Sequence, residues 1–248
     1  MKGEATALSA KEAELPSVGR PGGLRWRLTG RVTAASRGAR FERFMEVMRP
    51  GPEDRILDVG VIDTSWRASN FLEVNYPWRE HITAVTLEEM SFFPAAFPDV
   101  AVVVADGRDL PFDDDQFDIG FSNAVIEHVG SRADQARFVS ELVRTCRRVW
   151  ISTPNARFPI DPHTLLPFVH WLPRRIRHPL LRWTGQGRWA TEAMLNPLSA
   201  DDLLGLFPAT EQVTLIRQRV AGLTSVLTAA TQGAPGRAPG RPTTGSSS

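Results

Sequence analysis

Four short apolar segments, each closed by a polar residue or a glycine and separated by helical patterns, constrain the fold more than any other feature. They cover 55–60 (RILDVG), 81–86 (HITAVT), 100–105 (VAVVVA) and 117–122 (FDIGFS), and a fifth covers 149–152 (VWIS). Strands that alternate with helices predict an α/β fold with a parallel sheet and right-handed crossovers. Such sheets bind ligands beyond the carboxyl ends of their strands, so we expect the functional residues directly after these segments.

Helices are predicted before and between the strands. Apolar residues at i, i+3, i+4 and i+7 over 41–48 form one helical stripe, which Pro50 ends. A second helix is expected over 67–76. A serine followed three residues later by an aspartate marks two further helix starts. These are Ser131 with Asp134, followed by the stripe Val139, Leu142, Val143 and Cys146, and Ser199 with Asp202. The closing segments 213–220 and 223–228 predict an antiparallel hairpin.

Composition places the chain among soluble globular domains. It has 248 residues, 42% hydrophobic and 23% charged, which suits one domain with a sizeable core. The formal net charge is only +1, so binding nucleic acid through bulk charge is not expected. The single cysteine, Cys146, excludes an internal disulfide and a cysteine metal cluster. The N-terminus carries charges where a signal peptide has its apolar stretch, and we therefore expect a cytoplasmic protein.

Both ends differ in composition from the rest. Residues 1–23 mix charges with Pro and Gly, and residues 232–248 are nearly free of apolar side chains. Neither segment buries enough surface to offset its ordering entropy. We therefore predict a flexible N-terminus over 1–23, a folded domain over 24–231 and a disordered tail over 232–248.

Polar residues and glycines follow four of the predicted strands. They are Asp58 and Gly60 after the first, Glu88 with Glu89 after the second, Asp106 and Gly107 after the third, and Asn123 after the fourth. Carboxylates there can accept hydrogen bonds from an amine or from ribose hydroxyls, and glycine lets the backbone approach a ligand. Each residue also has an ordinary structural interpretation, as a loop cap, a first-turn acid or a turn residue. Their coincidence at four strand ends suits one nucleoside.

The sequence from about Arg55 to Asn155 resembles the class I S-adenosylmethionine-dependent methyltransferases. ILDVG, ITAVTLEE, VADGRDLPFDDDQFDIGFSNAVIEHV and ISTPN resemble their successive motifs. The likeness is closest to the small-molecule branch with a type 11-like domain, which includes ubiquinone-type enzymes. The resemblance implies a Rossmann-like, doubly wound sheet of seven strands with a terminal antiparallel hairpin, and S-adenosylmethionine as the cofactor.

The resemblance also assigns the strand-end residues. Asp58 and Gly60 would face the methionine and ribose, Glu88 the ribose hydroxyls, Asp106 with Gly107 the adenine, and Asn123 the sulfonium. The sequence departs from the family pattern at two places. Only the first glycine of the usual glycine-rich loop remains, in DVGVIDT, and the usual acid at the end of the second strand is Thr86. These changes indicate either a rebuilt pocket or a pocket that has lost its cofactor.

A hydroxyl acceptor would benefit from a general base with a pKa near the working pH. His128 and His163 are the candidate catalytic residues, although His128 also suits an ordinary position on a helix surface. The spacing of the five histidines, His81, His128, His163, His170 and His178, indicates no set of metal ligands. We therefore expect no metal site.

The segment from Asn155 to Ala190 departs most from the family pattern. It carries six arginines against one aspartate, with Trp171, Trp183 and Trp189 among them. We expect a helical lid over about 156–198, inserted after the fifth strand, that shapes the acceptor site. Arg and Trp mixed with Leu and Ile are typical of an interfacial helix, so residues 171–189 either contact an anionic membrane or form a cap packed on the sheet.

The sequence favours methyl transfer to a small-molecule or lipid-linked acceptor. It does not fix which atom is methylated, nor the oligomeric state. A catalytically inactive scaffold with this fold is the main alternative, because of the altered glycine loop. A dinucleotide-dependent oxidoreductase is disfavoured, because its fingerprint needs three glycines at the first turn and two are missing.

Overall fold

The computed structural model describes residues 24–64, 69–191 and 194–233. The flexible N-terminus predicted over 1–23 lies outside these residues, as does all of the predicted tail except Gln232 and Gly233. The model contains a seven-stranded mixed sheet with strand order β3-β2-β1-β4-β5-β7-β6, which confirms the predicted fold class. The strands are β1 (Ile56–Val59), β2 (Ile82–Thr86), β3 (Ala101–Val104), β4 (Phe117–Asn123), β5 (Cys146–Pro154), β6 (Val213–Val220) and β7 (Leu223–Thr231).

The sheet is parallel from β3 to β5 and ends in the predicted hairpin. Val59 of β1 lies opposite Val85 of β2, and Thr86 lies opposite Val104 of β3, so these strands finish at one edge. β7 runs antiparallel to both β5 and β6. The order reverses beside β1, which has β2 on one side and β4 on the other. Ligands of open α/β sheets bind beyond the strand ends at such a point.

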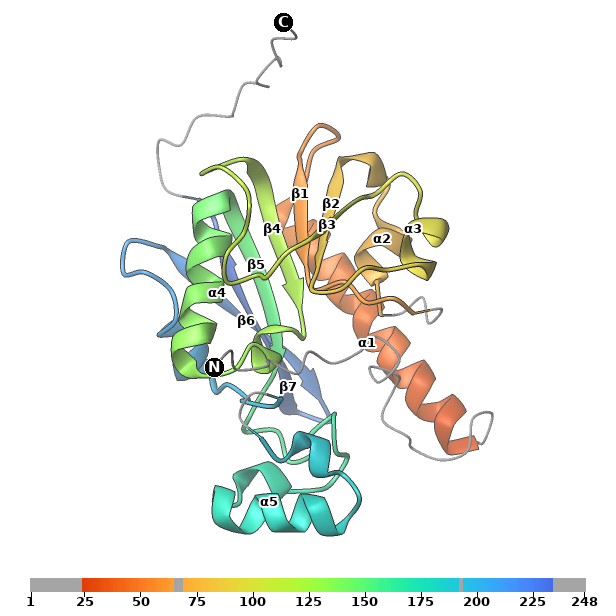
Figure 1. Ribbon diagram of the computed structural model, residues 1–248, viewed down its shortest axis with the longest axis vertical. Helices are drawn as coiled ribbons and strands as arrows, with labels where there is room; N and C mark the ends of the chain where they lie inside the picture. The colour runs from red at the N-terminus through yellow and green to blue at the C-terminus, as the bar shows by residue number, and fades with distance from the viewer. Residues whose placement is uncertain (1–23, 65–68, 192–193, 234–248) are drawn as a thin grey trace, which may run out of the picture.

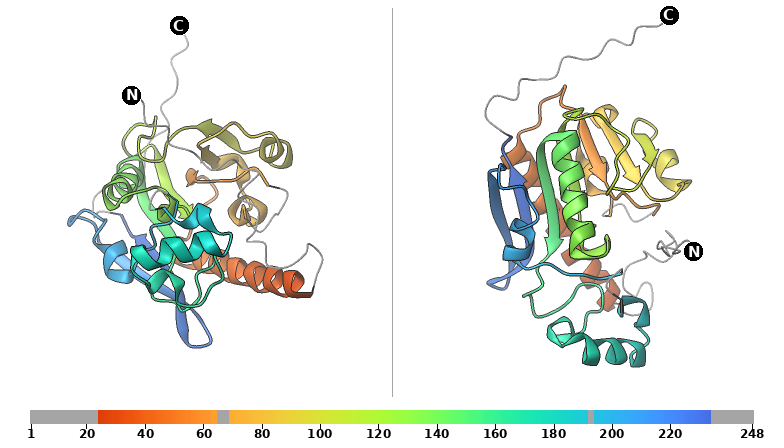
Figure 2. Two further views of the ribbon diagram at one scale, coloured as in Figure 1. Left: turned by 60° about the horizontal axis from the view of Figure 1, so that its bottom comes forward. Right: turned by 60° about the vertical axis from the view of Figure 1, so that its left-hand side comes forward.

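Helices cover both faces of the sheet (Figures 1 and 2). One face packs against α1 (Leu24–Met48), α2 (Phe71–Asn75) and α3 (Phe92–Ala96), around the buried Phe44 and Trp150. The other face packs against α4 (Arg132–Thr145) and α6 (Ala200–Leu204). Successive residues of β1 pack into the two cores: Ile56 packs on the side of α1, and Leu57 on the side of α4.

Two of the four predicted helices start at their predicted capping boxes, whereas the other two start elsewhere: α1 begins at Leu24, well before the predicted stripe over 41–48. Ser131 with Asp134 and Ser199 with Asp202 form complete capping boxes at α4 and α6, as predicted. The helix expected over 67–76 is shorter: α2 begins only at Phe71, and residues 65–68 lie outside the described part. Cys146, assigned above to the stripe of α4, is the first residue of β5, although it is buried in the same core.

The lid lies beyond the carboxyl end of β5 (Figure 1). It contains α5 (Arg174–Trp183) and the short 3₁₀ turns η4 (Val169–Trp171) and η5 (Gly187–Trp189), packed around a small core of their own. An isolated parallel bridge joins Asn155 to Leu198, so the two ends of the lid meet. Within the described residues, none of the helices combines the length and the apolar character needed to cross a membrane.

Candidate functional site

The carboxyl edge of the sheet holds the predicted strand-end residues, and one small pocket joins three of them. Asp58, Gly60 and Asn123 line it together with Asn70 and Phe71. Its free space is little more than that of a water molecule or two, so a nucleoside would have to displace side chains that line it. Glu88, Asp106 and Gly107 follow β2 and β3 at the same edge but do not line this pocket.

The two predicted glycines are required by packing. Gly60 has φ of +107°, and a Cβ there would lie 2.2 Å from Cγ2 of Val125. A Cβ on Gly107 would lie 2.6 Å from the ring of Phe138. A close approach to a ligand, the reason considered in the sequence, is therefore not needed to explain either glycine.

The loop that replaces the family's glycine-rich turn is held by side-chain hydrogen bonds. Asn70 donates to the carbonyl oxygen of Ile62 at 2.9 Å and accepts from its amide at 3.2 Å. Asp63 accepts from the backbone amides of Ser91 and Phe93, 3.0 and 2.7 Å away, at the start of α3. Side chains thus fix the path of this loop in place of the flexible glycines.

Two acidic side chains are buried behind this loop. Asp58 is 6% exposed and Glu73 of α2 is 0% exposed. Within the described residues, neither carboxylate oxygen of Glu73 has a hydrogen-bond partner. Burial, and then the charge of Glu73, raise the pKa of Asp58 well above its ordinary value, and burial also raises the pKa of Glu73. A buried acidic pair of this kind is stabilised by a cationic group. S-adenosylmethionine carries an ammonium and a sulfonium, so these residues fit that cofactor.

Asn123 is positioned by the long N-terminal helix. Arg40 of α1 donates a short hydrogen bond to the amide oxygen of Asn123, and a second one to Oε1 of Gln218 on β6 at 3.2 Å. Burial lowers the pKa of Arg40 to about 10. A pKa of about 10 keeps the guanidinium charged at neutral pH, so the end of β4 carries a positive charge that would repel the sulfonium that the resemblance places there.

The residues assigned to adenine and ribose are arranged less directly. Both carboxylate oxygens of Asp106 accept hydrogen bonds from Arg108, at 2.9 and 2.6 Å, and these bonds are the main reason why the pKa of Asp106 is lowered. Arg108 also pairs with Asp134 at 3.3 Å. Glu88 donates its backbone amide to Thr86 Oγ1 at 3.4 Å. Their roles toward the cofactor stay predictions.

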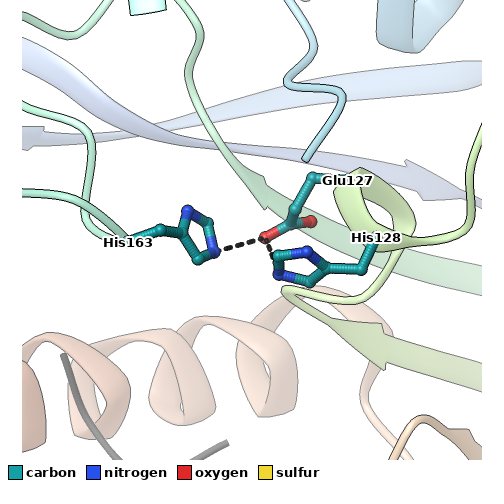
Figure 3. A group of neighbouring side chains, drawn as sticks. All are labelled: Glu127, His128 and His163. Carbon is teal, nitrogen blue, oxygen red and sulfur yellow. Dashed lines mark ion pairs between the residues drawn. The ribbon is translucent and has the colours of Figure 1, made fainter. Parts of the chain in front are cut away.

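A second group of side chains gathers on the lid side of β4 (Figure 3). Glu127 and His128 lie on η3 (Ile126–His128), just after β4, and His163 comes from the lid. The two imidazole rings are 4.7 Å apart, centre to centre. Nε2 of each histidine lies 3.9 Å from Oε1 of Glu127. The fold thus brings both candidate catalytic residues together, around a carboxylate.

The outer nitrogens of both histidines are held by acceptors. Nδ1 of His128 lies 2.7 Å from the carbonyl oxygen of Met194, and Nδ1 of His163 lies 2.9 Å from Oδ1 of Asp161. The ring of Trp189 packs against both imidazoles. Burial lowers the pKa of His128 to about 3. Burial also acts to lower the pKa of His163, but Asp161 and Glu127 outweigh it and the net pKa is raised.

Glu127 itself is anchored on one side only. It is 1% exposed, and Oε2 accepts a hydrogen bond from Thr153 at 2.9 Å. Among the described residues, Oε1 has no hydrogen-bond partner. Burial raises the pKa of Glu127. A pocket beside it is lined by His163, Asp161, Asn155 and His170, with room for about one water molecule.

Several site residues escaped prediction because they arrive from distant parts of the chain. Arg40 and Asn123 are 83 positions apart, and Thr153 and Glu127 are 26 apart. Glu73 sits on a helix whose apolar neighbours gave no sign of a functional acid. Asp161 had a local signal, because in DPHT it accepts from the amide two residues on, a turn that aspartate favours.

Comparison with known proteins places the chain beside methyltransferases. Residues 62–149 match the family model of a methyltransferase domain. A protein of Pyrococcus horikoshii OT3 is 14% identical, with a TM-score of 0.55 over 92% of this chain and 100% of its own. Geranyl diphosphate C-methyltransferase of Streptomyces coelicolor A3(2), solved with Mg²⁺, geranyl diphosphate and S-adenosyl-L-homocysteine, is 14% identical, with a TM-score of 0.52 over 87% of this chain and 86% of its own. No curated protein matches the sequence. The structural likenesses confirm the fold.

Proposed function

We propose that this chain, whose residues 62–149 match a methyltransferase domain, is an S-adenosylmethionine-dependent methyltransferase that methylates a small-molecule or lipid-linked acceptor held under the lid. The cofactor supplies an electrophilic methyl group on a positively charged sulfur. The observation that carries the proposal is the placement of two polar groups on either side of β4. On one side is the acidic pair, Asp58 of β1 and Glu73 of α2. On the other side, next to the lid, is the histidine cluster of Glu127, His128 and His163.

On the donor side, we propose that Asp58 holds the cationic methionine end of the cofactor. Gly60 and Asn123 line the same pocket, and Arg40 fixes the amide of Asn123. Glu88 is proposed to accept from the ribose hydroxyls. Asp106 with Gly107 is proposed to face the adenine, after Asp106 exchanges one of its bonds to Arg108.

On the acceptor side, we propose that His128 and His163 act on the acceptor together, with His163, whose pKa is raised, as the general base and His128, whose pKa is about 3, as a neutral hydrogen-bonding partner. Both rings are held by their Nδ1 partners and by Trp189. They are therefore already oriented before the reaction, and no side-chain entropy is lost when the acceptor reacts. Alignment of donor and acceptor supplies most of the catalysis in such a transfer, because well-oriented pairs reach effective molarities of about 10⁵–10⁸ M. Residues Leu195 and Pro197 close the small pocket on the lid side.

The first test is thermal unfolding of the full chain with and without S-adenosylmethionine. A ligand at about 100 times its Kd adds roughly 2.7 kcal/mol of stability, and each kcal/mol moves the midpoint of a chain this size by about 2–4 °C. We expect a rise of about 5–10 °C with S-adenosylmethionine or S-adenosylhomocysteine, and none with NAD. No rise at millimolar ligand would contradict the proposal and favour the inactive scaffold.

We also propose that the lid contacts an anionic membrane surface, which suits a lipid-linked acceptor. Trp183 is 84% exposed and Ile176 50% exposed on α5, beside the exposed Arg174 and Arg175. Trp189, in contrast, is buried against the histidines, so this part of the predicted segment packs on the site. Arg and large apolar side chains exposed on one helix are the composition of an interfacial helix.

Co-sedimentation with vesicles tests the membrane contact. We expect binding to anionic vesicles, weak binding to neutral ones, and at least a tenfold loss for the variant Arg174→Glu/Arg175→Glu. The exposed pair Arg217 and Arg219 on β6 offers a control with the same charge change away from the lid. Equal binding by both variants and the parent would contradict a contact through the lid.

A further inference from the structure

We propose that Glu127, His128 and His163 bind a divalent transition-metal ion, with zinc as its simplest occupant. The sequence spacing gave no indication of such a set, because His163 comes from the lid, 35 positions after His128. The three side chains offer one ligand atom each, and these atoms lie within 4.8 Å of one another. Two imidazoles and one carboxylate form a common ligand set of catalytic zinc and of non-haem iron.

The hydrogen bonds of the two rings leave the correct nitrogens available. The carbonyl oxygen of Met194 can only accept, so Nδ1 of His128 donates its proton to it. Asp161 in the same way accepts from Nδ1 of His163. The neutral form of each ring then carries its lone pair on Nε2. Histidines that bind metals are oriented in this manner by an acceptor on the other nitrogen.

Glu127 supplies the third ligand atom, and its buried, unsatisfied oxygen indicates that the site binds a cation. Thr153 satisfies Oε2, whereas Oε1 is buried, without a hydrogen-bond partner in the described part of the chain, and 3.9 Å from both Nε2 atoms. When both rings are neutral and Glu127 is ionised, the two Nε2 lone pairs and the carboxylate oxygen cannot hydrogen-bond to one another, because none of them is then a donor. A cation between them satisfies all three.

The spacing requires only a small closure. Ligand atoms about 2.0–2.2 Å from a tetrahedral zinc lie about 3.3–3.5 Å apart, against 3.9 Å here from Glu127 to each histidine. The three ligand atoms lie within 4.8 Å of one another, so the longest separation has to shorten by at most about 1.5 Å, shared among the side chains. The neighbouring pocket, lined by Asn155 and Asp161, has room for about one water molecule, which suits a further ligand to the ion.

Toward the acceptor, this inference rests on the proposed function. Three protein ligands leave at least one position free, as in catalytic zinc sites, and an oxygen of the acceptor would take it. The acceptor class is then one with a hydroxyl or carboxylate oxygen that binds a metal. The ion would lower the pKa of a bound acceptor hydroxyl, whose proton would pass to solvent water, and His128 and His163 would hold the ion instead of accepting that proton themselves.

Zinc binding to the full chain, freed of metal with a chelator, tests the proposal. In competition with a chromophoric chelator, we expect one zinc per chain, and at least a tenfold lower affinity for Glu127→Gln and for His163→Ala. Asp161→Asn, which removes only the acceptor of Nδ1, should weaken zinc binding by about 10–100-fold. His81→Gln, at the opposite edge of the sheet, is the matched control and should bind as the parent does.

Cobalt and folding measurements keep the result unambiguous. Co²⁺ added to the parent should give the visible absorption bands of a tetrahedral or five-coordinate ion, absent in Glu127→Gln/His163→Ala. Circular dichroism checks that each variant is folded. A folded parent that binds zinc no more tightly than this double variant would overturn the proposal.

S-adenosylmethionine binding, measured on the same samples, separates this proposal from the proposed function. If the chain binds S-adenosylmethionine but not zinc, the metal site is wrong, and direct activation of the acceptor by the histidines remains as the proposed function. Zinc binding without cofactor binding would support the metal site and contradict the proposed donor pocket.

Discussion

Asp58→Asn should weaken S-adenosylmethionine binding by about 30-fold or more. The ligand brings positive charge to a carboxyl group that is 6% exposed and whose pKa is raised by burial and by Glu73. Truncating one partner of a buried charge pair costs about 2–5 kcal/mol, which is roughly 30- to 4,000-fold in Kd. Isothermal titration of parent and variant measures this ratio. A variant that binds within threefold of the parent would place the cationic end of the cofactor elsewhere.

Glu73→Gln is the matched control, and it has a signature of its own in pH. The folded pKa of Glu73 lies above its ordinary value of 4.5, so the folded chain holds a proton that the unfolded chain releases. The parent's free energy of unfolding therefore falls as pH rises from about 4.5 toward the folded pKa. Glu73→Gln should lose this component of the slope, be more stable than the parent at pH 7, and lose less cofactor affinity than Asp58→Asn.

Gly60→Ala should destabilise the fold by about 2–5 kcal/mol, which lowers the midpoint of unfolding by about 5–15 °C. Two causes add. Gly60 has a positive φ that an alanine adopts with strain, and the new Cβ would lie 2.2 Å from Val125. Val125 directly precedes η3, which carries Glu127 and His128. Because the side chain of valine branches at Cβ, it cannot move away from the new methyl group without shifting the backbone at the start of η3.

Two further variants separate the causes in a thermal melt. Val125→Ala in the Gly60→Ala background should recover the part of the lost stability that is due to the clash, and the part that is due to backbone strain should remain. Gly38→Ala is the control, because Gly38 lies within α1 and a Cβ there meets nothing within 4 Å. We expect it to stabilise by about 0.5–1 kcal/mol. Equal melting of Gly60→Ala and the parent would show that packing does not require this glycine.

The fold was predictable from the sequence because its signals are local. Apolar runs such as VAVVVA, the two capping boxes and the two-residue turn between β6 and β7 each specify their element from neighbouring residues. The turn predicts the antiparallel hairpin of β6 and β7, and the family resemblance implies the same hairpin. The shortened α2 was not foreseen, since residues 67–76 carry an ordinary helical composition while the loop before Phe71 is fixed from Asn70 through Ile62.

The site was predictable only in part. Asp58, Gly60 and Asn123 were found because strand ends converge by geometry, and one pocket holds all three. The meeting of His128 with His163, and the buried Glu127 between them, depends on how the lid folds back. Where the chain returns from the lid, the backbone amide of Asn196 donates to the carbonyl oxygen of Glu127 at 2.7 Å. The side-chain amide of Gln135 donates to the carbonyl oxygens of Ile126 and Asn196, and so links the two segments. Such contacts leave no periodic signal in the sequence.

The bridge between Asn155 and Leu198 divides the chain into two parts, the sheet with its helices and the inserted lid. Because the lid leaves and rejoins the sheet at a single point, its length and content can change without shifting β1, α2 or the acidic pair. If the lid holds the acceptor as proposed, a change in residues 156–197 would alter the choice of acceptor and leave the strand-end residues of the proposed cofactor pocket in place.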